Sequence, residues 1–454
     1  MTAVLWFRRD LRLADHPALA EAGASRPGGV VGLFVVDDRL WGPSGDNRRA
    51  WLARTLAALD EQAGGRLVVR HGRPEQVVPA LVREVEAEAV YVSADFGPYG
   101  RGRDGAVAEA LGPVPLVGSG SPYAVDPGEV RAARGEPYRV FTPFHRGWTA
   151  HGWGVPVEVP PVTWVGGVAS AGRPGAPDVK AALPPAGEAA AHRRLDAFMA
   201  DVDRYGTLRD RPDLDRTSRL SPYLRWGTLH PRQVLAQLGE GPGAAKFRAE
   251  LAWREFYADV LWHRPESARR ALQPAMAAME VDTGPEADRR FEAWATGQTG
   301  YPYIDAGMRQ LLGEGWVHNR VRMAVASFLV KDLHLDWRRG ARWFMRHLVD
   351  GDLASNQHGW QWVAGTGTDP APYFRVFNPV TQGQRHDPHG DYVRRWVPEL
   401  AGVAGAAVHE PWKLGGLLAP AGYPPPIIDH GQERADALAR YQAARSTSAG
   451  RAHR

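Results

Sequence analysis

The first 120 residues alternate short apolar runs with stretches of helical periodicity, and this alternation restricts the fold more than any other feature of the sequence. The apolar runs are residues 4–7, 30–36, 67–69, 89–92 and 115–117, each suited to a buried strand. Between them, residues 48–59 place Trp51, Leu52, Leu56 and Leu59 at helical spacing. Because parallel strands need crossover connections, the pattern predicts a doubly wound parallel-sheet α/β domain.

The chain is too long for a single core. Its 454 residues exceed the roughly 250–300 at which one hydrophobic core stops growing. We expect an α/β domain at 1–125, a connector at 126–188 and an all-α domain at 189–454. The connector is expected because prolines and glycines in 151–188 break both helical and strand periodicity. After residue 189 the apolar spacing is helical.

What the sequence lacks excludes several kinds of chemistry. There is no cysteine, so disulfides and thiolate sites are excluded and any redox chemistry needs a bound cofactor. The turn after the first predicted strand, residues 7–12 (FRRDLR), lacks the glycine patterns of NAD and ATP sites. No apolar run approaches a membrane span and no signal peptide is visible, so we expect a cytoplasmic protein.

Tryptophans are concentrated in the second half, where eleven of the 17 lie from Trp226 onward among arginines. Helix cores account for such residues in part. Aromatic rings beside arginines also suit stacking on bases or on an isoalloxazine, and electron transfer between rings. Both interpretations stay open on composition alone.

Three segments gather polar and aromatic residues in a way that a solvated helix face does not require. Glu250, Trp253, Arg254 and Tyr257 share one face of a predicted helix. A second predicted helix places Asn319, Arg322 and Met323 on one side. Residues 350–362 contain two aspartates, an asparagine and two tryptophans. No third ligand stands at a suitable spacing for a metal ion there, so hydrogen bonding to a polar ring edge is the better interpretation.

These segments resemble the photolyase and cryptochrome family. The resemblance rests on residues 217–224 (TSRLSPYL), 253–257 (WREFY), 299–302 (TGYP) and 350–362. Residues 6–12 (WFRRDLR), 377–379 (FNP) and 395–400 (RWVPEL) extend it over almost the whole chain. The sequence is most similar to the class I cyclobutane pyrimidine dimer photolyases.

The resemblance implies FAD in the helical domain and ultraviolet-damaged DNA as the partner of a monomeric enzyme. The residues it implies for FAD are Tyr205, Arg209, Thr217, Ser218, Arg219, Leu220, Ser221, Arg254, Arg322, Asp350, Asp352 and Asn356. Asp350 is expected to pair with Arg322, and Asn356 to lie beside the flavin. The residues it implies for the lesion or its DNA are Glu250, Trp253, Asn319, Arg320, Met323, Trp362 and Gln382.

The implied reaction is light-driven electron transfer from reduced FAD to the dimer, followed by ring opening and return of the electron. The implied catalytic residues are Glu250, Asn356, Trp360 and Trp337. We hypothesise that Glu250 is neutral and donates a hydrogen bond to the dimer, because burial raises the pKa of a carboxyl group. Because photolyases act on a base that has been taken out of the stack, the resemblance also implies that the lesion leaves the DNA duplex.

Two parts of the family pattern differ here. Trp360 and Trp337 match the inner two members of a three-tryptophan electron chain, but the outermost member aligns near Gly284. Residues 97–104 (GPYGRGRD) are similar to the deazaflavin-binding members. They favour 8-hydroxy-5-deazaflavin as antenna over methenyltetrahydrofolate.

Two other functions remain as alternatives, a cryptochrome-type blue-light receptor and a photolyase for the (6-4) product. A receptor can lose the glutamate, tryptophan and methionine of the lesion pocket, and all three are present here. The (6-4) enzymes resemble a pattern with paired histidines, where this chain has Asn319 and Met323. His386 and His389 are expected to be exposed loop residues.

Overall fold

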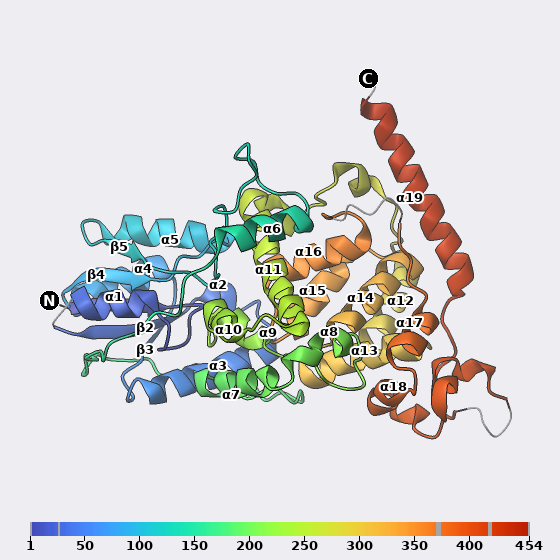
Figure 1. Ribbon diagram of the computed structural model, residues 1–454, viewed down its shortest axis with the longest axis horizontal. Helices are drawn as coiled ribbons and strands as arrows, with labels where there is room; N and C mark the ends of the chain where they lie inside the picture. The colour runs from blue at the N-terminus through green and yellow to red at the C-terminus, as the bar shows by residue number, and fades with distance from the viewer. Residues whose placement is uncertain (1, 26–27, 369–373, 416–419, 453–454) are drawn as a thin grey trace.

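The computed structural model describes residues 2–25, 28–368, 374–415 and 420–452. The N-terminal α/β half and the C-terminal helical half lie side by side along the long axis of the molecule (Figure 1). No β-strand follows β5 in the described part of the chain. The predicted fold class is confirmed.

The α/β half contains one parallel sheet in the order β3-β2-β1-β4-β5. Its strands are β1 (Thr2–Phe7), β2 (Val30–Val36), β3 (Val68–His71), β4 (Ala87–Val92) and β5 (Leu116–Gly118). Its helices are α1 (Pro17–Ser25), α2 (Asp38–Trp41), α3 (Asp46–Gln62), α4 (Pro74–Glu84) and α5 (Pro98–Leu111). Each predicted strand and the predicted helix at 48–59 therefore exist, with ends shifted by a few residues.

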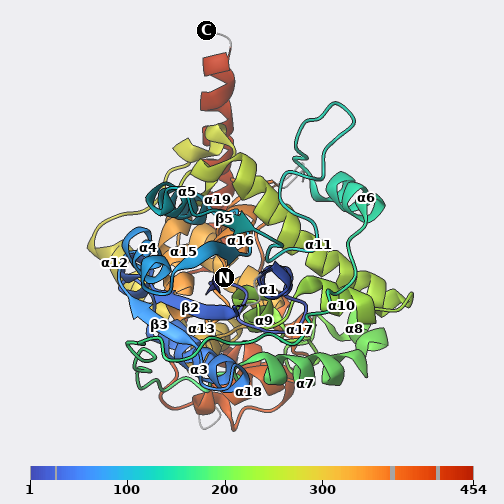
Figure 2. The same cartoon turned by 90° about the vertical axis from the view of Figure 1, so that its left-hand side faces the viewer.

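Side chains of each strand alternate between two cores, one on each face of the sheet. Leu5 and Phe7 of β1 pack with α1 and α3 on one face. Val4 and Trp6 pack with α4 and α5 on the other. Figure 2 looks onto this half of the molecule, with α3 on one side of the strands and α4 and α5 on the other.

The helical half is built from short and medium helices. The first are α7 (Glu188–Met199), α8 (Tyr205–Leu208), α9 (Ser221–Trp226), α10 (Pro231–Gln237), α11 (Pro242–His263), α12 (Pro285–Thr296) and α13 (Pro302–Glu314). The remainder are α14 (Asn319–Ser327), the π-helix η4 (Phe328–Asp332), α15 (Trp337–His347), α16 (Leu353–Ala364), α17 (Pro379–His386), α18 (Asp391–Trp396) and α19 (His430–Ala452). The last of these, α19, extends away from the body of the molecule (Figure 1).

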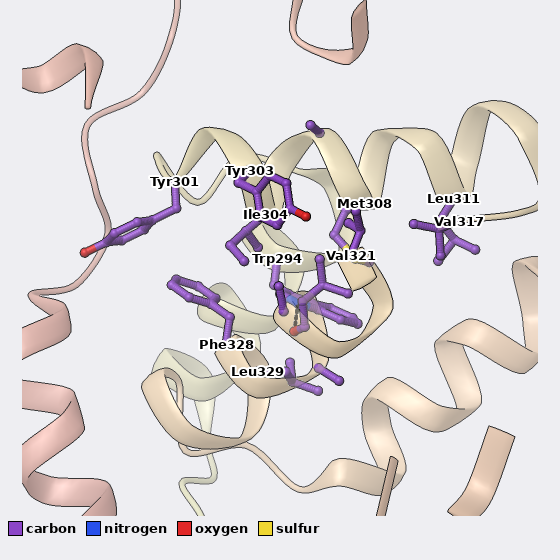
Figure 3. Close-up of a cluster of buried hydrophobic side chains, with 14 of the residues drawn as sticks. Trp294, Tyr301, Tyr303, Ile304, Met308, Leu311, Val317, Val321, Phe328 and Leu329 are labelled. Atoms are coloured by element: carbon purple, nitrogen blue, oxygen red, sulfur yellow. Dashed lines mark hydrogen bonds between the residues drawn. The ribbon is translucent and has the colours of Figure 1, made fainter. Parts of the chain in front are cut away.

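The main core of the helical half lies between α12, α13, α14 and α15. Trp294 of α12 is buried at its centre, and its indole Nε1 donates to the Val325 carbonyl oxygen at 2.9 Å (Figure 3). A buried indole needs such a partner for its N–H group. This core holds α14 and α16 in fixed positions, and both helices carry predicted site residues.

The connector includes one helix, α6 (Phe141–His151), followed by extended chain to residue 187. Trp164 in this extended chain bridges to Val30 and packs on the α1 and α3 face of the sheet. Gly227, just after α9, lies against the backbone of Arg9, where a Cβ atom would stand 1.9 Å from the carbonyl oxygen. Only glycine allows this close approach of the two halves.

Candidate functional site

Arg322 and Asp350 form the ion pair that the sequence predicts. The Arg322 guanidinium donates to Asp350 Oδ2 at 2.8 Å and to the Val317 carbonyl oxygen at 2.7 Å. Asp350 is buried, and its other oxygen, Oδ1, has no hydrogen-bond partner among the described residues. Because buried carboxylate oxygens are normally paired, this atom is available to a bound ligand.

The loop at residues 217–221 has a strained backbone. Arg219 adopts a left-handed conformation with φ of 49°, which is uncommon outside glycine and is concentrated at functional sites. Its guanidinium lies 4.3 Å from the centre of the Trp316 ring, and Trp316 Nε1 donates to Ser221 Oγ at 3.2 Å. Thr217 Oγ1 is buried and lacks a partner in the described part of the protein. The loop is therefore held in place while keeping a free hydroxyl.

Other contacts fix the backbone of this loop. Arg194 of α7 donates to the carbonyl oxygens of Thr217 and Ser218, both at 2.6 Å. Leu220 is fully buried in the core between α7 and α11. Such support restricts the positions that the loop can offer a ligand.

Asp352 lies at the contact between the two halves, a position that the sequence did not predict. Its carboxylate accepts a hydrogen bond from Arg9 at 2.8 Å, and Arg225 lies 4.0 Å away. It also caps α16 by accepting from the Ser355 backbone N–H at 3.0 Å. A flavin bound at Asp352, as the resemblance implies, would therefore compete with Arg9 and the Ser355 N–H group for the carboxylate.

The electrostatics of this contact are dominated by arginine. Burial alone would raise the pKa of Asp352, but Arg9 and Arg225 outweigh it and hold that pKa well below its usual range. Burial lowers the pKa of Arg225 to about 9 and that of Arg48 to about 10. Arg48 has no carboxylate partner among the described residues. The contact therefore has an excess of buried positive charge.

A small pocket opens at the same place. It is lined by Arg9, Phe96, Gly97, Tyr123, Ala258, Leu261, Asp352, Leu353 and Ala354. These residues come from the loops after β1, β4 and β5, from α11, and from the N-cap and first turn of α16. The pocket thus connects the edge of the sheet with the helical half.

Asn356 and Trp360 project from α16, one helical turn apart. The amide nitrogen of Asn356 donates to the Ala341 carbonyl oxygen at 3.1 Å and to Gln357 Oε1 at 2.9 Å, which leaves its amide oxygen for a ligand. Trp360 is buried and packs edge-on against Phe344. Trp337 is buried in the same core at the start of α15.

Glu250 of α11 forms an ion pair with Arg209, which follows α8. Arg209 also lies 5.4 Å from the centre of the Tyr205 ring, which is buried against Phe247. The sequence did not predict this contact with Arg209. That Glu250 is neutral and donates a hydrogen bond to the dimer stays a prediction.

A second ion pair lies beside the first. Arg320 donates to Asp210 at 2.9 Å, and Asp210 also lies 3.9 Å from Arg209. Asn319 and Arg320 contact the sulfur of Met323 at 4.0 and 3.8 Å. The structure thus brings together the predicted lesion-facing residues of α11 and α14.

Other predicted lesion-facing residues are not in direct contact with this group. Trp253 stacks on Phe141 of the connector, with ring centres 3.7 Å apart and planes inclined by 7°. Trp362 and Gln382 are half-buried on α16 and α17.

Arg254, one of the residues that the resemblance implies for FAD, donates to two backbone carbonyl oxygens, those of Pro122 and Leu224. It therefore supports the chain at the domain contact.

Two histidines near the ion pairs are buried and neutral. His386 is 6% exposed, so the expectation of an exposed loop residue is wrong; the residue ends α17 and packs into the protein. Burial lowers the pKa of His386 to about 4 and that of His318 to about 3. His389 is exposed, as expected.

Sequence reasoning missed several residues that hold the site. The most informative is Glu255, which accepts from Trp148 Nε1 and from two backbone N–H groups at residues 124 and 125. Burial raises the pKa of Glu255 to about 7. Glu255 belongs to the WREFY segment on which the family resemblance rests, but the sequence did not indicate which groups would donate hydrogen bonds to its carboxylate.

The described part of the chain contains no helix long and apolar enough to cross a bilayer. Two buried oxygens of the helical half, Thr217 Oγ1 and Asp350 Oδ1, have no hydrogen-bond partner among the described residues and are therefore candidates to bind a ligand. These hydrogen-bonding atoms lie on the strained loop at residues 217–221 and in the turn between α15 and α16, and they fit a large polar cofactor. The fold and site thus define a two-domain protein that holds a large cofactor in its helical half.

Comparison with known proteins names that class. Residues 3–162 match the family described as DNA photolyase, and residues 247–443 match the FAD binding domain of DNA photolyase. Two curated proteins named deoxyribodipyrimidine photo-lyase match over nearly full length. The one from Halobacterium salinarum is 40% identical over 97% of this chain and 99% of its own. The one from Streptomyces griseus is 43% identical over 98% and 99%.

The crystal structure of a bacterial class III photolyase from Agrobacterium tumefaciens is similar throughout. It has a TM-score of 0.90 and 36% identity, with 98% of each chain covered. The chain belongs to the DNA photolyase family. Its assignment to class I stays a prediction.

Proposed function

We propose that this protein is a deoxyribodipyrimidine photo-lyase, which uses light and FAD to split cyclobutane pyrimidine dimers in damaged DNA. The observation that carries the proposal is the full-length similarity to proteins of that name. The lesion-side group around Glu250 and Met323 is consistent with it. When bound, FAD supplies the electron for dimer cleavage and receives it back.

The residues proposed for FAD divide by what they offer. Thr217, Ser218 and Ser221 offer hydroxyl groups from the 217–221 loop. Asp350 offers its free Oδ1 while Arg322 holds the carboxylate in place. Asn356 offers its amide oxygen. These groups orient the cofactor, and the surrounding core excludes water.

On the lesion side, the protein's residues must bind the dimer and stabilise charge on its carbonyl groups. Glu250 and Arg209 already form an ion pair there. We propose that lesion binding separates this pair, so that Arg209 or Glu250 can meet the dimer. Trp253, Asn319, Arg320, Met323, Trp362 and Gln382 would contact the lesion or the DNA around it.

The (6-4) alternative is disfavoured by the histidines. Both His318 and His386 are buried, with lowered pKa values, and His318 Nδ1 accepts from the Arg320 backbone N–H. A neutral, capping histidine cannot act as an acid toward a lesion at pH 7. The receptor alternative is disfavoured by the retained Glu250, Trp253 and Met323.

We propose that the antenna binds at the carboxyl edge of the sheet, where open α/β sheets hold ligands. Asp37 follows β2, Asp95 follows β4, and Tyr99 donates to Asp37. Arg48 and Arg225 keep buried nitrogens without partners among the described residues. These cations favour 8-hydroxy-5-deazaflavin, whose acidic hydroxyl group can ionise, over methenyltetrahydrofolate.

The test illuminates the purified protein, with its FAD reduced, on one oligonucleotide with a cyclobutane dimer and one with a (6-4) product. Repair of the first alone supports the proposal. Repair of neither would favour the receptor. For the antenna, the protein is incubated with each chromophore and the retained one is identified by absorbance; retention of the folate alone would contradict the deazaflavin proposal.

A further inference from the structure

At Gly284, where the family pattern expects the outermost tryptophan of the electron chain, the protein has no aromatic ring. Gly284 is exposed at the start of α12, and a Cβ atom there would meet nothing within 4 Å. No ring contact joins Trp337 to Trp360 among the described residues. An electron chain along the family's expected positions therefore lacks its outer end, and its inner step, from Trp337 to the Trp360 ring that packs against Gly340 of α15, is not a direct ring contact.

Another line of rings does make close contacts. Trp360 lies 6.1 Å from Trp294, which lies 5.7 Å from Phe291. Phe291 in turn lies 5.9 Å from Trp343 of α15. The distances join ring centres, and each step is an edge-to-face or tilted contact. Electron transfer through protein falls steeply with separation, so continuous ring contact favours this line.

The two outer members of the line are less buried than the two inner ones. Trp294 is fully buried and Trp360 is 3% exposed, whereas Phe291 and Trp343 are half-buried. A positive charge is costly in a dry core and is stabilised by solvent. The half-buried Trp343 ring is therefore better placed than Trp360 for solvent to stabilise a positive charge, while its indole Nε1 is buried and has no hydrogen-bond partner among the described residues.

Two polar contacts assign roles to the middle members. Trp294 Nε1 donates to the Val325 carbonyl oxygen, which stabilises positive charge on the indole (Figure 3). The Arg339 guanidinium lies 4.4 Å from the centre of the Phe291 ring and disfavours positive charge there. Phe291 thus connects the two tryptophans without being oxidised itself, and Trp294 is a residue on which the positive charge can be localised.

We propose that Trp294 and Trp343 replace the missing outer tryptophan and carry electrons inward to Trp360 when the flavin is photoreduced. This inference rests on the proposed FAD site. One electron leaves Trp360 for the cofactor; Trp294 re-reduces Trp360, and Trp343 re-reduces Trp294 across Phe291. Oxidised Trp343 regains its electron from a thiol in solution. Two such thiols lose two electrons and two protons in all and join as a disulfide.

The test compares Trp343→Phe, Trp294→Phe and Trp337→Phe with the wild type, each loaded with oxidised FAD. Blue light is applied with dithiothreitol present, and flavin reduction is followed by absorbance. A light flash without thiol is followed by electron paramagnetic resonance, which detects the tryptophan radical. We expect Trp343→Phe and Trp294→Phe to lose the long-lived radical and most of the photoreduction, and Trp337→Phe to keep both.

Trp262→Phe is the matched control, since Trp262 is a partly exposed tryptophan elsewhere on α11 that packs on Phe96. Equal flavin content and melting temperature exclude misfolding as the cause. Loss of the radical in Trp337→Phe with normal Trp343→Phe and Trp294→Phe variants would overturn the inference. Repair by protein reduced chemically in the dark should be equal in wild type and Trp343→Phe. If none of them repairs dimers, the proposed function fails, while the radical signal still decides the electron path.

Discussion

The contact between the two halves and the proposed lesion side of the helical half both use arginine–carboxylate pairs, but in different proportions. On the lesion side each arginine has its own carboxylate, Arg209 with Glu250 and Arg320 with Asp210. At the domain contact, Arg9 and Arg225 share Asp352, and Arg48 has no carboxylate partner among the described residues.

The two groups of ion pairs therefore suit different roles. Those at the domain contact stabilise the docking of the two halves, and those on the proposed lesion side can change partners. Arg9 and Asp352 keep little surface, and that surface lines the pocket between the halves. Removing a carboxylate there leaves arginines without a counter-charge. The lesion-side carboxylates are 28% and 42% exposed, so solvent can replace either partner. Balanced, accessible pairs suit a surface that must change partners when DNA binds.

The largest expected effect is on Asp352. Asp352→Ala should lower the free energy of unfolding by about 3 kcal/mol or more, because it leaves Arg9 and Arg225 without their carboxylate. Asp336→Ala is the matched control. Asp336 also caps a helix, by accepting from the Arg338 backbone N–H, but its arginine is exposed; only the cap, worth about 1 kcal/mol, is lost. Equal losses in denaturant unfolding would refute the proposed difference.

The second effect is a pH dependence from Glu255, a buried carboxyl held by neutral donors. The raised pKa of Glu255, about 7, means that the folded state binds its proton more tightly than the unfolded state. Its stabilising contribution is full below about pH 4.5 and is lost as the pH rises through about 7. We expect the wild type to lose about 3 kcal/mol relative to Glu255→Gln over this range.

Unfolding curves of both proteins at several pH values measure that difference. A difference that does not vary with pH would show that Glu255 has the same affinity for protons in both states. Glu399→Gln is the control, since Glu399 is an accessible carboxylate paired with Arg309.

The third effect should fall on repair rather than on stability. Glu250→Gln keeps the shape of the side chain but removes the charge that pairs with Arg209. We expect the repair yield per photon to fall about tenfold, the equivalent of one charge-assisted hydrogen bond. The free energy of unfolding should change by less than about 1 kcal/mol. Unchanged repair at equal flavin content would remove Glu250 from the mechanism.

The smallest expected effect is on DNA affinity. Arg320→Gln should weaken binding to dimer-containing DNA and reduce its salt dependence by about one phosphate contact. Stability should change by less than about 1 kcal/mol, because the pair with Asp210 is partly exposed. Arg309→Gln breaks a similar pair away from the lesion side. Equal binding by the two variants would mean that Arg320 does not contact DNA.

Much of the fold could be predicted because its signals are local. The five strands and the helix at 48–59 follow from residue periodicity within short windows. The Arg322–Asp350 pair was predictable from motifs that stand 28 residues apart. The identity of the cofactor and of the reaction came from the same motifs, since cofactor and lesion together restrict residue types at many positions.

Only the tertiary structure decided which charges meet. Arg9 and Asp352 are separated by 343 residues, and their contact depends on how the two halves dock at Gly227. The pairing of Glu250 with Arg209, the stacking of Phe141 on Trp253 and the rings around Trp360 have the same origin. The sequence determines which residue types are available at each position. Their partners follow from the packing of segments far apart in the chain, which no local pattern encodes.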